Sequence, residues 1–390
     1  MGVFEEDGEI YPSEIVRLWV SEGFLKPIDN KSLTKIAEQY LKELVDRNLI
    51  LVHESKILGD VICYKIHDLL RDLSIKEAEK QRFFYVLREE SPQGLISQQR
   101  IVIPTSTSEE KIQDALEYMP HARSYLVFGN QTVGQFSNSR FLRLLHSDNW
   151  NSEAEYSQLN VFKLMNSRYH RFVIINKKFV IPSSINLLWN LDTLIILGGG
   201  GLTAPTEIWK MYKLRHLEVY GLHIPDPSSA DDDIIMMENL EVKIKLESLS
   251  LWSHSPDIGK YLQKINFPPS LKELFLELES DLEWEDILQT IGSLPLLEKL
   301  VLYERSLQKT TLDNGRQLPL STSYRASSFF VKRIEGDSSR NWRNTNTQIL
   351  EEQQDLHGDQ LDLLVRVKVL KEDAALMQKL ATSNFKVKVF

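Results

Sequence analysis

The sequence predicts a multidomain α+β protein, in which a winged-helix-like segment precedes an irregular leucine-rich-repeat solenoid of the α/β horseshoe type. Three observations predict it. Residues 1–90 show helical and strand patterns in the order helix, helix, hairpin, helix. An apolar-x-x-apolar-x-apolar pattern then recurs at intervals of about 23 to 32 residues, and leucine-rich repeats have periods in or near this range. The composition, 42% hydrophobic and 26% charged, is that of a globular protein.

The N-terminal elements follow from spacing and capping residues. A helix is predicted over 12–24, because Pro12 suits a first turn and apolar residues follow at helical spacing. Ser32 is the expected N-cap of a second helix, and runs 49–52 and 61–64 predict a hairpin. The apolar stripe of the second helix is Ile36, Tyr40, Leu41, Leu44 and Val45, and a third helix starting near His67 places Leu69, Leu70 and Leu73 on one side.

Many winged helices bind DNA, so a DNA-associated regulator is the alternative function for this segment. Residues 1–90 contain 13 Lys and Arg against 18 Asp and Glu, a net charge of −5. The whole chain has a net charge of −9. A DNA reader needs a basic face, and an anionic membrane also attracts Lys and Arg. We therefore expect a protein partner, and neither nucleic acid nor an anionic membrane as the main partner.

Composition and missing motifs exclude several other classes. No run of the sequence reaches the roughly 18–20 apolar residues of a membrane span. The acidic first residues 1–11 are unlike a signal peptide, and a single cysteine, Cys63, excludes an internal disulfide or a multi-cysteine zinc site. The phosphate-loop pattern G-x-x-x-x-G-K-[ST] and the hydrolase motifs H-E-x-x-H and G-x-S-x-G are absent. We expect a cytoplasmic protein that is not an enzyme, with no metal site and no cofactor of its own.

The repeat pattern gives a register for the solenoid between residues 100 and 306. Six matches are Leu159/Phe162/Leu164, Leu191/Leu194/Ile196, Leu214/Leu217/Val219, Leu246/Leu249/Leu251, Leu271/Leu274/Leu276 and Leu297/Leu300/Leu302, with a weaker one at Ala122/Tyr125/Val127. An ordinary α/β domain with leucine-rich strands is the alternative. The repeats predict one short strand each, with these residues buried in the solenoid.

The residues between the buried positions are predicted to face the concave side. They are Val161, Lys163, Thr193, Ile195, His216, Glu218, Tyr220, Ser248, Ser250, Trp252, Glu273, Phe275, Glu277, Lys299, Val301 and Tyr303. Four of them form an aromatic stripe of the kind enriched at protein interfaces. The predicted partner-binding residues are His216, Glu218, Tyr220, Trp252, Glu273, Phe275, Glu277 and Tyr303. Alternatively, Trp252 and Phe275 pack under neighbouring loops. Of the concave positions, Thr193 and Glu273 are expected to be exposed neighbours of the buried leucines.

Specific blocks of the sequence resemble a known family. They are Met1–Pro12, Leu18–Phe24, Tyr40–Ile50 and Ile66–Leu73 in the first part, Ile181–Leu194 and Glu207–Leu217 in the repeats, and Gln348–Leu356 near the end. These blocks resemble plant disease resistance proteins with a coiled coil, a nucleotide-binding module and leucine-rich repeats, and the late blight resistance group of the nightshades in particular. The resemblance covers roughly residues 1–365, and it identifies residues 1–90 as the winged-helix remnant of the nucleotide-binding module.

The resemblance implies a role in innate immunity. It implies recognition of a pathogen effector or a host immune protein by the repeats, a hypersensitive response, and a cytoplasmic location in which peripheral membrane association is possible. A family triplet that contacts bound ADP matches Ile66, His67 and Asp68, with Ile66 replacing Met. ADP or ATP is therefore a ligand of the full-length family, and we expect His67 and Asp68 to be vestigial here. A non-functional gene fragment is a further alternative.

The predicted domain limits are 1–90 for the winged-helix remnant and 100–306 for the repeats. Residues 307–346 lose the leucine period and are rich in serine and arginine, so a polar, flexible insert is predicted there. Residues 347–390 form a C-terminal segment whose role the sequence does not indicate.

Overall fold

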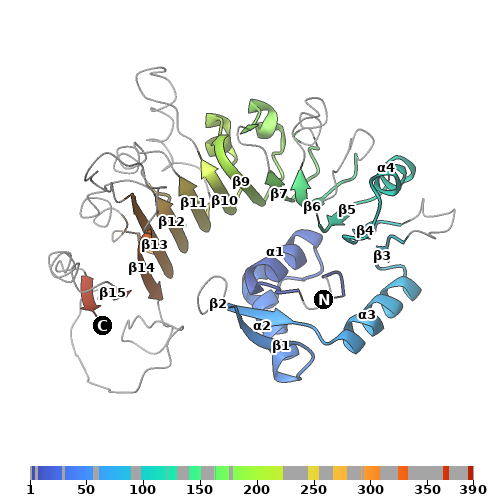
Figure 1. The fold of residues 1–390 in the computed structure, drawn as a ribbon, viewed down its shortest axis with the longest axis horizontal. Helices are drawn as coiled ribbons and strands as arrows, with labels where there is room; N and C mark the ends of the chain where they lie inside the picture. Colours follow the sequence, from blue (N-terminus) through green and yellow to red (C-terminus); the bar gives the residue numbers. More distant parts are fainter. Residues whose placement is uncertain are drawn as a thin grey trace, which may run out of the picture. The chain divides into compact units, whose positions relative to one another are not determined.

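A computed structural model places most of the N-terminal two hundred residues and shorter parts of the remainder. The residues described are 2–4, 8–28, 31–55, 61–88, 98–119, 121–129, 140–150, 162, 164–174, 179–222, 245–253, 267–278, 291, 294–307, 324–332, 363–368 and 385–389. The chain forms two compact units, Met1–Gly199 and Gly200–Phe390. The winged helix and the first repeats therefore share one unit, whereas the sequence predicts a boundary near residue 90. Each unit is described separately below (Figure 1).

The first unit begins with the predicted helix, helix, hairpin, helix order. The elements are α1 (Pro12–Glu22), α2 (Leu33–Asp46), β1 (Leu51–Ser55), β2 (Val61–Lys65) and α3 (Asp68–Lys80). Strands β1 and β2 pair antiparallel, as the hairpin prediction requires.

The ends of these helices follow the capping rules. Pro12 occupies the first turn of α1, where its missing N–H costs nothing. Gly23 caps the other end at φ 76°, in the left-handed region that glycine adopts without strain. Ser32 accepts a hydrogen bond from the backbone N–H of Lys35 at 3.2 Å and so caps α2.

Two of the predicted apolar stripes are only partly buried. In α2, Ile36 and Leu41 are buried, but Tyr40 is 44% exposed, so the apolar stripe is not buried along its whole width. In α3 the buried residues are Ile75 and Ala78, while Leu69 and Leu73 are 75% and 61% exposed.

A parallel sheet follows the winged helix in the first unit. Its strands run in the order β3, β4, β5, β6, β7, β9, and each pairs in parallel with the next. The bounds are β3 (Tyr85–Val86), β4 (Arg100–Ile103), β5 (Ser124–Val127), β6 (Leu144–Trp150), β7 (Tyr169–Ile174) and β9 (Thr193–Thr203), with β8 (Phe179–Val180) beside β9. Helix α4 (Glu109–Tyr118) and the 3₁₀ turn η2 (Ser183–Leu187) lie between strands along the chain.

The repeat register is confirmed in part of this unit. Ala122, Tyr125 and Val127 are fully buried around β5, as the weaker match predicts. Leu194 and Ile196 are likewise buried in β9. The match at Leu159/Phe162/Leu164 is wrong, because the strand of that repeat is β7, which begins ten residues later at Tyr169. Leu159 lies outside the described residues.

The winged helix packs against one face of this sheet. One core cluster contains Ile15 and Leu18 of α1 together with Leu126, Leu144 and Tyr169 of the strands. At its margins, the carboxylate of Glu22 binds Arg100 at 2.8 Å. A second contact joins Glu14 Oε1 to His146 Nδ1 at 3.5 Å. In Figure 1 α1 lies alongside β6 and β7, which it contacts.

This packing overturns the exposure expected for Thr193 on the predicted concave face. Thr193 is fully buried and Ile195 is 4% exposed, so Thr193 is not the exposed position that the sequence suggests. Ile195 belongs to the shared core cluster, because the winged helix covers the face on which it lies. The equivalent predicted positions Val161 and Lys163 lie outside the described residues.

The second unit continues the repeat pattern. Strands β10 (His216–Leu222), β11 (Ser248–Ser253), β12 (Glu273–Leu278) and β13 (Lys299–Leu307) pair in parallel, and β14 (Tyr324–Lys332) pairs antiparallel with β13. Strands β15 (Leu363–Lys368) and β16 (Phe385–Val389) extend the sheet, and the 3₁₀ turn η3 (Thr206–Lys210) precedes β10. Strand β14 falls inside the predicted flexible insert. Among the described residues, no helix has the length and apolarity needed to cross a bilayer.

Candidate protein-binding surface

The surface predicted to bind a partner is one face of strands β10 to β13. The leucines of the repeat pattern, such as Leu217, Leu249 and Leu274, are each 1% exposed and therefore fill the opposite face. Since side chains alternate along a strand, the residues between them share the candidate face.

The strand register arranges the candidate residues in three rows across the sheet. The first row is His216, Ser248, Glu273 and Lys299; the second is Glu218, Ser250, Phe275 and Val301; the third is Tyr220, Trp252, Glu277 and Tyr303. Trp252 and Tyr303 thus lie two strands apart, as the sequence predicts. Phe275, however, belongs to the second row, so the aromatic residues form a bent cluster and not a straight stripe.

Three of the aromatic side chains contact one another. The ring centroids of Tyr220 and Trp252 are 3.9 Å apart in an edge-to-face arrangement, with an interplanar angle of 65°. Trp252 also reaches diagonally to Phe275, with centroids 5.7 Å apart. All three residues are half-buried. We call Tyr220, Trp252 and Phe275 the aromatic surface. Edge-to-face packing of this kind adds to the energy of area burial.

The polar residues around the aromatic surface differ in accessibility. Glu218 and Glu273 are half-buried. His216 is 8% exposed and contributes little accessible area. The indole Nε1–H of Trp252 is buried and has no hydrogen-bond partner in the described part of the chain. The side chains of Glu277 and Tyr303 lie outside the described residues, and only their strand positions are known.

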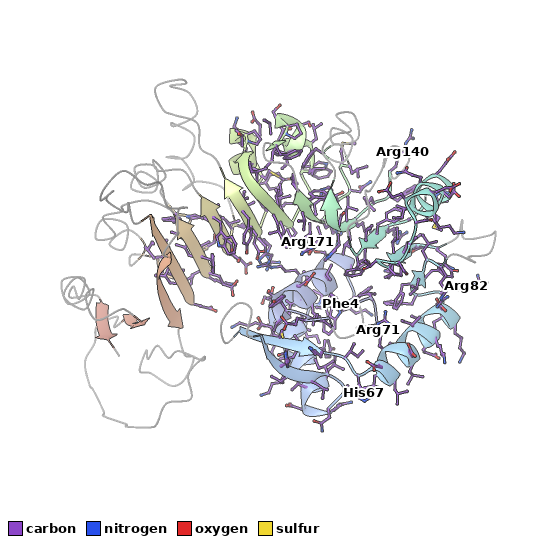
Figure 2. All side chains as sticks on the ribbon, in the orientation of Figure 1. Phe4, His67, Arg71, Arg82, Arg140 and Arg171 are labelled. Carbon is purple, nitrogen blue, oxygen red and sulfur yellow. The ribbon has the colours of Figure 1, made fainter. Side chains whose placement is uncertain are left out.

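The second set of predicted residues lies at the start of α3. His67 is the N-cap of α3, and its Nδ1 accepts a hydrogen bond from the backbone N–H of Leu69 at 3.4 Å. Asp68 follows in the first turn, where the helix dipole favours a negative charge. Both side chains are exposed. Figure 2 shows His67 on the side of the winged helix away from the sheet of the first unit, whereas Arg71 reaches back to bind the carbonyl oxygen of Phe4 at 2.8 Å.

The two predicted sets belong to different units of the chain, and the structure adds contacts that the sequence pattern does not indicate. Chief among the latter are the residues of the first unit that hold the winged helix, including Glu22, Arg100 and His146. The sequence carries only a partial signal for this cover. On the covered face Val102, Leu126 and Leu144 are apolar, but Ser124 and His146 in the same rows are polar, as are several equivalent positions of β10 to β12.

Comparison with known proteins agrees with this architecture. A sequence profile of the disease resistance protein winged helix domain matches residues 3–74. A putative late blight resistance protein homolog of Solanum demissum is 30% identical over 348 residues, which are 82% of this chain and 43% of that protein. A second late blight resistance homolog from that species is 29% identical over 83% of this chain and 28% of its own length.

The chain carries a disease resistance winged helix domain and is similar over most of its length to resistance proteins of the late blight type. It spans between about a quarter and a little under half of the length of the curated relatives that it matches. Similarity extends to a putative disease resistance RPP13-like protein 3 of Arabidopsis thaliana, 26% identical over 81% of this chain and 40% of that protein. Among solved structures, an internalin from Listeria monocytogenes aligns with a TM-score of 0.37 and 15% identity, covering 57% of this chain and 63% of the internalin.

Proposed function

We propose that this late blight resistance-type chain acts in plant defence by binding a protein through the aromatic surface of its second unit. The observation that carries the proposal is the packed cluster of Tyr220, Trp252 and Phe275 on a sheet face that also bears carboxylates. Interface energy concentrates in such aromatic anchors. Partly accessible Glu218 and Glu273 favour a partner with basic residues next to its apolar contact.

The partner is a pathogen effector or a host immune protein, and its capture would lie upstream of the hypersensitive response. Such binding takes place in the cytoplasm and uses no catalytic step. The names of the relatives support the defence role, since all those cited above for sequence similarity are resistance proteins or their homologs. The partner class is inferred from the chemistry of the surface.

The double variant Trp252→Ala/Tyr303→Ala is expected to lose partner binding in a pull-down from infected and uninfected plant extract. Truncating one aromatic anchor typically costs about 2 kcal/mol, which corresponds to a roughly 30-fold loss of affinity. Moderate weakening by salt is also expected, because the flanking carboxylates are screened.

A matched control is Trp189→Ala/Tyr212→Ala, which removes the same two residue types at positions that are each 48% exposed. This control should retain the partner. Equal capture by wild type and by the Trp252 variant, with both folds confirmed by circular dichroism, would place recognition on another surface. Capture of no specific protein by wild type would favour the gene-fragment alternative.

A second proposal concerns His67 and Asp68. In a longer chain that carries a nucleotide-binding module, these two residues would keep the family's contact with ADP. Their exposure, next to the exposed Leu69 and Leu73 on the same helix, favours packing of another module at this end of α3. The test is to fuse the module of a relative in front of residue 1 and to measure ADP retention with His67→Ala and, as control, Lys76→Ala. Equal retention by the two variants contradicts the role.

A further inference from the structure

One residue stands directly before the strand in each repeat, and its backbone N–H donates to the carbonyl oxygen of its counterpart in the preceding repeat. In the first unit these bonds join Gln99 to Arg123, Arg123 to Arg143, Arg143 to Arg168, and Arg168 to Asp192, with N···O distances of 2.6, 2.7, 2.7 and 2.9 Å. Parallel strands lie about 4.8 Å apart, so three arginines start on neighbouring strands within about 10 Å. We call Arg123, Arg143 and Arg168 the arginine ladder.

The equivalent position in the second unit carries alternating charges. There Glu247 binds Arg215 at 2.7 Å and Lys272 at 2.8 Å. Burial alone would raise the pKa of Glu247, but hydrogen bonds and charges from Lys272 and Arg215 hold it below its ordinary value. In the second unit, the charges at this backbone position therefore neutralise one another. Like charges on neighbouring strands are destabilising, so a run of three arginines needs a compensating reason.

The charges around the arginine ladder do not supply that compensation. Two carboxylates lie nearby. Glu22, whose side chain is 7% exposed, is held by Arg100 in an ion pair of 2.8 Å. Asp192, next to Arg168 at one end of the ladder, accepts a hydrogen bond from the hydroxyl of Thr193 at 3.2 Å. The C-terminal end of α1 adds roughly half a negative charge. None of the three ladder arginines makes an ion pair or a side-chain hydrogen bond with the residues that the structure describes. Burial, then the charges of Arg123 and Arg168, lower the pKa of Arg143.

We propose that the arginine ladder binds a compact anion that carries two or more phosphate groups. Guanidinium groups bind phosphate oxygens in a bidentate manner, and three of them match a ligand with about three negative charges. The ladder also limits the size of the ligand. It ends at the neutral Gln99 on one side and at the carboxylate of Asp192 on the other. A long polyanion that runs along the sheet would meet that carboxylate.

The site adjoins the contact between the winged helix and the repeats. Arg168 Nη1 lies 3.9 Å from the point where a side chain at Gly23, the C-cap of α1, would begin. Arg143 also feels the charge of Glu22 at the end of α1. A bound phosphate compound therefore stabilises the arrangement in which α1 packs on β6 and β7, because a ligand that binds only the folded state shifts unfolding.

The test is calorimetry and thermal unfolding of the full chain with inorganic tripolyphosphate at fixed ionic strength. Wild type is expected to bind, and saturating ligand should raise the unfolding midpoint by about 5 °C or more. Arg143→Gln and the exposed Arg168→Gln should each weaken binding at least tenfold, as expected for a lost charge-assisted hydrogen bond. Arg47→Gln removes an exposed arginine next to α2 that pairs with Glu43, and it should bind like wild type.

The ligand-free midpoints separate a binding role from a structural one. With repulsion relieved, Arg143→Gln should unfold at the wild-type midpoint or above it. A lower midpoint without ligand, together with unchanged tripolyphosphate binding, would overturn the proposal and make Arg143 a structural partner of α1. Absence of binding by wild type would also overturn it. Citrate binding as tightly as tripolyphosphate, or binding of a short DNA duplex without binding of tripolyphosphate, would contradict the ligand class.

Discussion

Replacing Leu249 with alanine is expected to lower the free energy of unfolding of the second unit by about 2–5 kcal/mol, the usual loss when a buried leucine site is emptied. Leu249 is 1% exposed in β11. The register places it between Leu217 of β10 and Leu274 of β12, so its side chain is enclosed by leucines of both neighbouring repeats. Leu274→Ala in the second unit and Leu194→Ala in the first unit should behave in the same way, because both residues are equally buried.

The matched control is Leu296→Ala, since Leu296 is 45% exposed and belongs to the same unit as Leu249. Its substitution should change stability by about 0.5 kcal/mol or less, as is usual for surface positions. Glu273→Ala, on the opposite face of the sheet, should also have a small effect. Urea unfolding followed by circular dichroism measures all of these variants. If Leu249→Ala and Leu296→Ala lose similar stability, the assignment of leucines to the buried face is wrong.

The sequence predicts this register well where leucine occupies the buried positions. Leu217, Leu249, Leu274 and Leu300 recur in a regular pattern, and burial of each follows from the alternation of side chains along a strand. The winged-helix order is equally predictable, because Pro12 and Ser32 mark helix starts by local chemistry.

Prediction fails where polar residues replace the leucines. Leu194 of β9 pairs with His170 of β7, which in turn pairs with Leu145 of β6. Ile196 pairs with Phe172, which in turn pairs with Ser147. Ser147 and His170 are fully buried or nearly so, yet they do not match an apolar template. The pattern instead matches Phe162 in the preceding connection. Phe162 is only 2% exposed, but it lies outside any strand.

The covering of the first unit's sheet by the winged helix is a tertiary effect that periodicity does not encode. An alternating strand shows which residues share a face, but not whether solvent, a partner or another domain lies over that face. The difference lies in side-chain chemistry. Leu126 and Tyr169 on the covered face are buried in the shared core, whereas the equivalent face of the second unit offers Glu218 and Ser250. The exposure predicted for Thr193 is wrong for this reason.

His170→Leu is expected to stabilise the first unit, an unusual direction for a core substitution. His170 is fully buried, and neither ring nitrogen has a hydrogen-bond partner within the described residues. Its neighbours in register are Leu145 and Leu194, both fully buried. An unsatisfied buried polar group costs about 1–3 kcal/mol, and leucine has nearly the same volume as histidine. The variant should therefore gain stability of about that size at pH 7.

The pH dependence of stability gives the sharper test. Burial lowers the pKa of His170 to about 3, from 6.5 in an unfolded chain. Between these two values the unfolded state binds more protons than the folded state, so the folded state loses stability as the pH falls through 6.5. Wild type should lose about 2 kcal/mol from this residue between pH 7 and pH 5, and His170→Leu should not. The exposed His121 supplies the control His121→Leu, which should keep the wild-type slope. Urea unfolding at both pH values measures the difference, and parallel losses in wild type and His170→Leu would show that His170 is solvated or hydrogen-bonded in solution.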